Sequence, residues 1–108
     1  MALNFKINRK RKNRNIYLKL SGDFDGASAL ELVRTLERAS SKANNIYIDT
    51  CGLFSIQDFG EDVFLKNCPI SQVAYQKLIF SGSYGDRLAP KGGYYLFNHR
   101  KIRQTMLN

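Results

Sequence analysis

Cysteine and histidine are scarce in this sequence. Among its 108 residues, only Cys51, Cys68 and His99 are of these two types. Two cysteines are too few for a disulfide framework, and they do not form a CxxC pair. With a single histidine they also lack the ligand spacing and the fourth ligand of a zinc site. We therefore expect two reduced thiols and no metal site.

Long apolar runs are also absent. No stretch approaches the roughly 20 apolar residues of a membrane-spanning helix, and the segment Met1–Lys6 does not resemble a signal peptide. The length suits one domain, and 44% apolar with 24% charged residues is an ordinary globular mixture. We expect a single domain over residues 1–108, located in the cytoplasm.

The familiar catalytic and nucleotide-binding motifs are missing too. The sequence contains no GxSxG, HExxH, P-loop or GxGxxG pattern. His99 has no acid beside it in sequence. Asp23, Asp25 and Asp49 are spaced as acids of turns and strand ends rather than as a catalytic pair. We predict that the protein is not an enzyme, has no catalytic residues and needs no cofactor.

Positive charge is abundant but confined to one region. The formal net charge is +8, and residues 1–20 contain seven Lys and Arg without any acid. Five of these bases form a basic patch: Arg9, Lys10, Arg11, Lys12 and Arg14. Such a patch suits phosphate contacts with nucleic acid or an anionic membrane, or it is only a solvated hairpin tip. Tyr17 is the only aromatic residue nearby in sequence, which gives base stacking little support.

Apolar periodicity divides the chain into elements. Strands are predicted at residues 3–7, 16–20, 46–50, 77–82 and 94–97. Helices are predicted at residues 27–41 and 58–67, with a basic tail helix from Asn98. The connecting segments are a polar link at 8–15, an ambiguous stretch at 71–76, and an irregular or single helical turn at 83–93.

This order of elements predicts an α/β fold. A hairpin followed by alternating helices and strands favours a mixed, mostly parallel sheet of about five strands, with an antiparallel edge strand from the N-terminal hairpin. Two main helices and short C-terminal helical turns are expected to pack on this sheet.

The segment 45–64 is the centre of the prediction. Its β-branched and aromatic run Ile46–Thr50 is typical of a buried strand, and Cys51–Gly52 suggests a turn after it. Asp58 is a favourable N-cap residue with Glu61 three positions later, as in a capping box. We expect Asp58 to cap the second helix, as Asp25 caps the first, and to leave free N–H groups for a partner.

Three residues of this segment leave alternatives open. Phe54 and Phe59 are either core residues or exposed apolar contacts of a partner surface. Gly60 lowers helix propensity by about 1 kcal/mol, so either another element or a ligand is expected to approach its backbone closely.

Two motifs carry a resemblance to a known family. The first is a strand followed by Gly, an acid, an apolar residue and Asp, and it lies in Leu20–Leu32. The second is a strand ending in Asp, an apolar loop and a helix-opening Asp-x-Gly, and it lies in Ile46–Gly60. Together they resemble the STAS family of bacterial anti-anti-sigma factors and sulfate-transporter tails. The resemblance implies a STAS-like fold and a non-catalytic, regulatory protein-interaction module.

One position departs from the family pattern. Kinase-switched STAS domains carry serine two residues before the motif glycine, where this chain has Asp58 preceded by Gln57. A serine kinase cannot phosphorylate aspartate, so the resemblance implies that the kinase switch is absent. Asp58 then either only caps the helix or acts as a fixed negative charge, weaker than the roughly −1.5 to −2 of a phosphate.

The resemblance also implies a partner and the surface that binds it. The surface would be formed by Asp23, Asp25, Ser55, Gln57, Asp58, Phe59, Gly60 and Glu61. The expected partner is an anti-sigma-like kinase or a transport or signalling component. The alternative function is binding of the basic patch to nucleic acid or to an anionic membrane.

Overall fold

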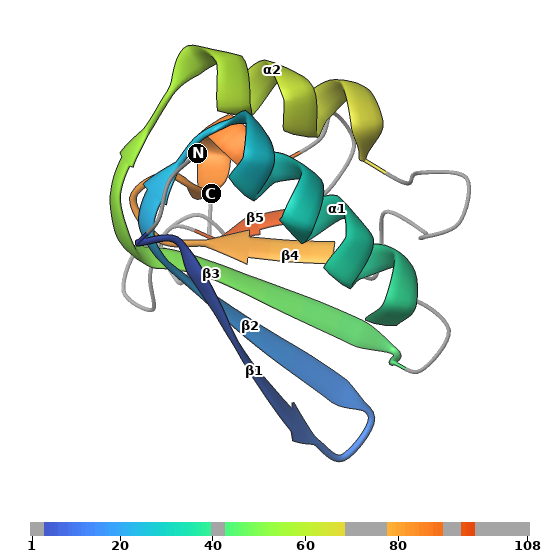
Figure 1. The fold of residues 1–108 in the computed structure, drawn as a ribbon. Coiled ribbons are helices and arrows are strands. Elements are labelled where there is room, and N and C mark those ends of the chain that lie inside the picture. Colours follow the sequence, from blue (N-terminus) through green and yellow to red (C-terminus); the bar gives the residue numbers. More distant parts are fainter. Residues whose placement is uncertain (1–3, 40–42, 69–77, 90–93, 97–108) are drawn as a thin grey trace.

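A hairpin is followed by alternating helices and strands (Figure 1). The computed structural model describes residues 4–39, 43–68, 78–89 and 94–96, the last of these by their backbone alone. The strands are β1 Lys6–Lys12, β2 Asn15–Phe24, β3 Asn45–Ile56, β4 Leu78–Ser81 and β5 Tyr94–Leu96. The helices are α1 Gly26–Ala39, α2 Asp58–Asn67 and the short α3 Gly85–Leu88. The predicted tail helix, the stretch 71–76 and His99 lie outside the described residues.

The strands form one sheet in the order β1-β2-β3-β4-β5. β1 is antiparallel to β2, whereas β2–β3, β3–β4 and β4–β5 are parallel pairs. Parallel neighbours need a crossover connection, and α1 lies in the connection between β2 and β3. Both α1 and α2 lie on the same side of the sheet (Figure 1). The predicted α/β class with a mixed sheet is confirmed.

The hydrophobic core lies between the sheet and these two helices. Along β2, Ile16, Leu18 and Leu20 are buried, whereas the alternating Tyr17 and Lys19 are exposed. Successive side chains of a strand point to opposite faces. One face of β2 is therefore buried under the helices, and the other remains open in the described part of the chain.

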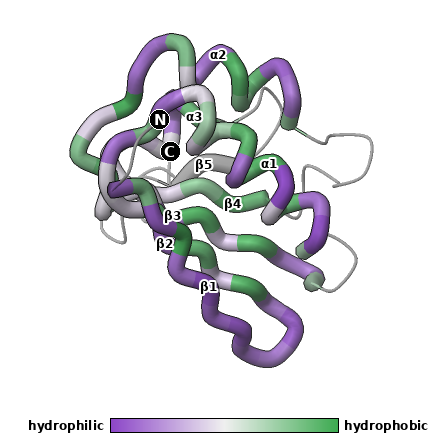
Figure 2. Tube along the Cα trace, viewed as in Figure 1, coloured by the Kyte–Doolittle hydropathy of each residue, from purple (hydrophilic) through white to green (hydrophobic). Residues whose placement is uncertain are grey.

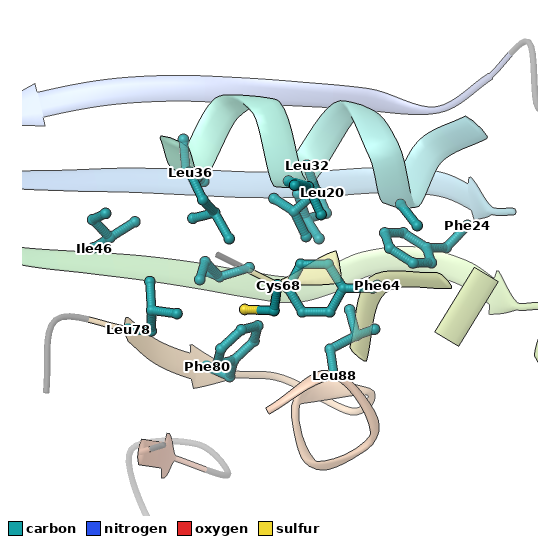
Figure 3. Packing of buried hydrophobic residues seen from close by; sticks show 14 of the residues in the cluster. Leu20, Phe24, Leu32, Leu36, Ile46, Phe64, Cys68, Leu78, Phe80 and Leu88 are labelled. Atoms are coloured by element: carbon teal, nitrogen blue, oxygen red, sulfur yellow. The ribbon is translucent and has the colours of Figure 1, made fainter. Parts of the chain in front are cut away.

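Three phenylalanines link the layers of this core. The Phe64 ring from α2 meets Phe24 of β2 edge-on, with ring centroids 6.4 Å apart, and Phe80 of β4 with centroids 6.1 Å apart (Figure 3). All three rings are fully buried. Edge-to-face contacts of this kind add to the stabilisation that burial provides. Phe64 thus anchors α2 to two strands at once.

The structure corrects the prediction for the N-terminal hairpin. The predicted strand at 3–7 and polar link at 8–15 are replaced by β1 over Lys6–Lys12 and a short connection at Asn13–Arg14. Asn13 has a φ of 57°, a left-handed conformation that asparagine tolerates. Apart from Ile7, which packs against the core, β1 and this connection are hydrophilic (Figure 2). An edge strand is held by its backbone ladder and does not need alternating apolar side chains.

The structure also corrects the predicted end of the third strand. β3 continues past Thr50 to Ile56, so Cys51–Gly52 is not a turn. The pairing with β2 shifts between Lys19↔Asp49 and Ser21↔Gly52, which leaves one extra residue in β3, as in a β-bulge. The Asp49 carboxylate accepts a hydrogen bond from the Cys51 N–H at 2.9 Å. Because this amide is satisfied locally, the ladder resumes beyond the irregularity.

The cysteines have different environments. Cys51 is exposed within β3, and Cys68 is buried just after α2, where burial raises its pKa to about 11. Among the described residues, no three His, Cys, Asp or Glu side chains gather in a way that could hold a metal ion. The described helices are also too short or too polar for any of them to span a membrane.

Candidate functional site

The start of α1 is built as predicted. Asp25 follows β2 directly, and its carboxylate accepts hydrogen bonds from the N–H of Ser28 at 2.9 Å and from the Ser28 hydroxyl at 2.8 Å. A side-chain oxygen that takes an N–H of the first turn defines an N-cap. Asp25 is buried, so its role is to fix the β2–α1 junction.

Asp23 joins three segments at this junction. Its carboxylate accepts hydrogen bonds from the Ser55 hydroxyl at 2.7 Å and from the Asn4 amide at 3.0 Å. The Asn4 side chain also accepts the N–H of Asp23 at 3.1 Å. These bonds, with Ser55 the larger cause, lower the pKa of Asp23 below its ordinary value of 3.8. Asp23 and Ser55 therefore hold the end of β3 beside the end of β2.

Replacing Ser55 with alanine is expected to raise the pKa of Asp23 towards 3.8, because the donor that most favours the carboxylate is removed. A carboxyl group whose pKa is lowered in the folded state stabilises the protein at pH values above its ordinary pKa. This contribution is lost as the pH falls through the folded-state pKa. When the pH is lowered below 3.8, the free energy of unfolding of S55A should therefore fall less than that of the wild type. NMR titration of the Asp23 carboxyl measures the change, with S83A as a control at an exposed serine. An unaltered Asp23 titration in S55A would contradict the assignment.

The start of α2 differs from the prediction. Gln57 is the N-cap residue, in extended conformation and without a side-chain cap bond, and Asp58 is the first helical residue. The N–H of Gln57 donates to the carbonyl of Phe24 at 2.9 Å. Because this bond holds Gln57 beside the end of β2, the helix begins at Asp58, one residue earlier than a cap at Asp58 would allow. The predicted capping box of Asp58 and Glu61 is wrong.

Asp58 and Glu61 instead share an arginine from α3. Arg87 Nη2 donates to the Asp58 carboxylate at 3.0 Å, and Arg87 Nε donates to the Glu61 carboxylate. The hydrogen bond to Glu61 is the main reason that the pKa of Arg87 is raised. Asp58 is fully exposed, and exposed ion pairs add little to stability. The two ion pairs with Arg87 neutralise part of the acidic charge and orient the Asp58 and Glu61 carboxylates towards α3.

The two phenylalanines whose placement was open are exposed. Phe54 is 76% exposed and Phe59 is 68% exposed. The alternative that Phe54 and Phe59 are core residues is therefore wrong, whereas Phe64 of the same helix as Phe59 is buried. The Phe59 ring lies across Gly26, because a Cβ built on Gly26 would come within 2.7 Å of it.

A shallow groove runs between the first turns of α1 and the start of α2. Its volume is about 510 Å³, and it is lined by Asp25, Gly26, Ala27, Leu30, Gln57, Phe59 and Val63. Leu30 is 41% exposed and adds apolar surface next to Phe59. Large exposed apolar side chains on a groove indicate a binding surface. We refer to these seven residues as the helix groove.

The predicted site residues separate into three places. Asp23 and Ser55 form the polar link between the ends of β2 and β3, next to the N-cap Asp25. Gln57 and Phe59 line the helix groove with Asp25. The remaining three are the exposed Asp58 and the partly buried Glu61, which contact Arg87, and the buried Gly60.

The close approach at Gly60 is made by another element. A Cβ on Gly60 would lie 2.8 Å from the Phe24 carbonyl oxygen and 2.9 Å from the Asp25 carbonyl carbon. The first turn of α2 therefore packs directly on the backbone where β2 passes into α1. The helix groove exists because these two helix starts come so close together.

Comparison with known proteins rests on structure alone. No protein-family model matches the chain, and no curated protein matches it in sequence. The structure of the anti-sigma factor antagonist SpoIIAA in its unphosphorylated form matches with a TM-score of 0.62 at 10% identity, covering 94% of this chain and 97% of that chain. The chain has a SpoIIAA-like fold. An uncharacterised DUF3478-family protein from Shewanella loihica, itself described as SpoIIAA-like, matches with a TM-score of 0.58 at 16% identity over 96% of this chain and 93% of that chain.

The SpoIIAA-like fold confirms the resemblance that the two motifs indicated. Identities this low support the fold and leave the function to be argued from this chain's own residues. Within that fold, all five residues of the basic patch are exposed, on β1 and the connection that follows it. The patch belongs to the sheet edge formed by β1, whereas the helix groove lies between α1 and α2.

Two residues of these sites were missed by sequence reasoning. Arg87 lies in a stretch predicted only as an irregular turn, 29 positions after Asp58. Leu30 is assigned no role by the sequence pattern and lines the helix groove. Neither has a local sequence signal, because each becomes part of a site only when distant elements are brought together.

Proposed function

We propose that this chain is a non-catalytic regulatory module of the cytoplasm that binds a protein partner through the helix groove. The observation that carries the proposal is the exposed Phe59 ring beside Leu30 on an open groove at the junction of two helices. Binding energy in protein interfaces concentrates in a few large apolar or aromatic residues surrounded by a polar rim. The SpoIIAA-like fold supports a partner of the anti-sigma-factor kind, or a transport or signalling component.

We propose that the polar, mostly acidic surface at the start of α2, outside the lining of the groove, forms the rim of this site. Asp58, Glu61 and Asp62 lie in the first turns of α2, and Arg87 contacts two of them. A partner with an apolar side chain for the groove and basic groups around it would complement this surface. The rim sets the orientation of the partner, and Phe59 supplies most of the affinity.

We infer that binding at this surface is not switched by a serine kinase. Asp58 stands where the resemblance places the phosphorylated serine, and it cannot accept a phosphoryl group from such a kinase. Its single negative charge is also paired with Arg87 at 3.0 Å. A paired carboxylate is a poor substitute for a dianionic phosphate. Asp58 therefore acts as a fixed part of the rim rather than as a permanent mimic of the phosphorylated state.

Replacing Phe59 with alanine is expected to weaken partner binding by at least about tenfold, because aromatic hot-spot residues carry most of an interface's energy. D58R should abolish capture, because it replaces one acid of the rim with a base, which also repels Arg87. The immobilised chain would first capture its partner from a lysate of the source organism, and the affinity of the identified, purified partner would then be measured. Y17A, a truncated aromatic on the open face of the sheet, is the matched control. Unchanged affinity in F59A and D58R, with folding verified by circular dichroism, would remove this surface from consideration.

A further inference from the structure

The face of the sheet opposite α1 and α2 carries a second group of polar and aromatic side chains. The strand pairing aligns Lys10 of β1 with Tyr17 of β2 and Tyr47 of β3. The neighbouring row is Asn8, Lys19 and Asp49. Residues that are paired across adjacent strands point to the same face. Because Leu18 and Ile48 between these rows are buried in the core, both rows lie on the open face.

The two tyrosines form the centre of this face. Their rings are stacked, with centroids 4.8 Å apart and planes inclined by 8°. Tyr17 is 37% exposed. A hollow of about 450 Å³ lies beside the pair, lined by Asn8, Arg9, Lys10, Tyr17, Leu18, Lys19, Tyr47 and Asp49. This volume is within the range of small-molecule sites. It accommodates one planar ring against the stacked pair Tyr17–Tyr47, which we refer to as the aromatic wall.

Charge and hydrogen-bonding groups surround the aromatic wall. Lys10 and Lys19 line the hollow, and the exposed bases Lys6, Lys12 and Arg14 extend the positive charge along the same sheet edge. Asn8 and Asp49 place an amide and a carboxylate at the same hollow. The ligand that matches this set is planar, edged with donors and acceptors, and linked to several negative charges.

We propose that the open face of the sheet binds single-stranded nucleic acid. One base stacks on the Tyr17–Tyr47 pair, Asn8 and Asp49 contact its edge, and the lysines contact the flanking phosphates. Stacking platforms within a basic surface are the usual means of binding single strands. This surface goes beyond the proposed function, since it shares no residue with the helix groove.

A membrane surface is a poorer match for the same residues. Adhesion to anionic lipid requires positive charge but has no use for an amide and a carboxylate in the hollow, and Asp49 opposes it. A double helix is also disfavoured, because its bases are stacked on one another and cannot reach the tyrosines. The tyrosine pair therefore makes a single strand the best match.

The test is fluorescence anisotropy with labelled 12-nucleotide single-stranded RNA and DNA, at about 50 mM and about 200 mM salt. Wild-type protein is expected to bind, and more weakly at the higher salt. Y17A and Y47A should each weaken binding about tenfold, whereas Y17F, which keeps the ring, should bind like the wild type. K10A/K19A should weaken binding and reduce its salt dependence.

Matched controls separate this surface from the rest of the molecule. R34A/R38A removes two exposed bases from α1, and F59A removes an exposed ring from the helix groove. Both should bind the oligonucleotides within about twofold of the wild type. Absence of binding at low salt would overturn the proposal. It would also be overturned if only the lysine variant lost binding, or if phosphatidylserine vesicles bound with the same dependence on both lysines and tyrosines.

Discussion

Replacing Phe64 with alanine is expected to lower the free energy of unfolding by about 3–5 kcal/mol. The ring is fully buried and contacts Phe24 on one side and Phe80 on the other (Figure 3). Its removal loses the free energy gained by burying the ring. It also leaves a cavity between α2 and the sheet, which the surrounding strands cannot close. Two edge-to-face contacts are lost at the same time. Because domains of this size have only about 5–15 kcal/mol of stability, F64A should be at the limit of folding.

The matched control is F59A, which truncates the same residue type on the same helix. Phe59 is 68% exposed, and exposed substitutions usually change stability by no more than about 0.5 kcal/mol. Urea denaturation followed by circular dichroism measures both variants. If F59A cost as much as F64A, the ring would belong to the core and could not carry the proposed partner surface. The pair therefore tests the fold and the proposed site together.

Replacing Gly60 with alanine is expected to destabilise the protein by about 1–3 kcal/mol. Alanine improves helix propensity by about 1 kcal/mol, but the new methyl would lie 2.8 Å from the Phe24 carbonyl oxygen and 2.9 Å from two backbone atoms of Asp25. These are backbone atoms at the junction of β2 and α1, so they cannot rotate away as a side chain could. Relief requires α2 to move away from the junction, which would also change the shape of the helix groove.

Gly26 provides the control for this substitution. A Cβ there would meet the Phe59 ring at 2.7 Å, and this ring is exposed and free to turn outward. G26A should therefore change stability by less than about 0.5 kcal/mol. Thermal or urea unfolding of the two variants gives the comparison. If G60A and G26A lost similar amounts of stability, the contact between Gly60 and the backbone of Phe24 and Asp25 would not be the cause of the loss in G60A.

The parts of the site that the sequence predicted correctly depend on neighbours in the chain. The Asp25 cap needs only Ser28 three residues away, and the helix 26–39 follows from its apolar spacing. Residues 58–67 were also predicted as helix, and α2 has these bounds. In these cases the stabilising contacts lie within one or two turns, so a local pattern is enough to predict them.

The incorrect predictions involve contacts between distant segments. Asp58 has the side chain of a good N-cap, yet Gln57 takes that position because its N–H binds the Phe24 carbonyl. Thr50 looked like the end of a strand, but its hydroxyl donates to the Ser81 carbonyl at 2.7 Å and β3 continues past it. Because the buried Thr50 hydroxyl is hydrogen-bonded to the neighbouring strand, it does not need solvent and the strand can continue.

By itself, the sequence determined the alternation of strands and helices, the α/β class and the likeness to the STAS pattern, because apolar periodicity and capping act over a few residues. Only the tertiary structure decided which side chains share a surface. Parallel pairing of β2 with β3 brings Tyr17 to Tyr47 across 30 positions, and packing brings Arg87 to Asp58 and leaves Phe59 exposed beside Leu30. These juxtapositions follow from strand register and layer packing, which no local pattern of residues encodes.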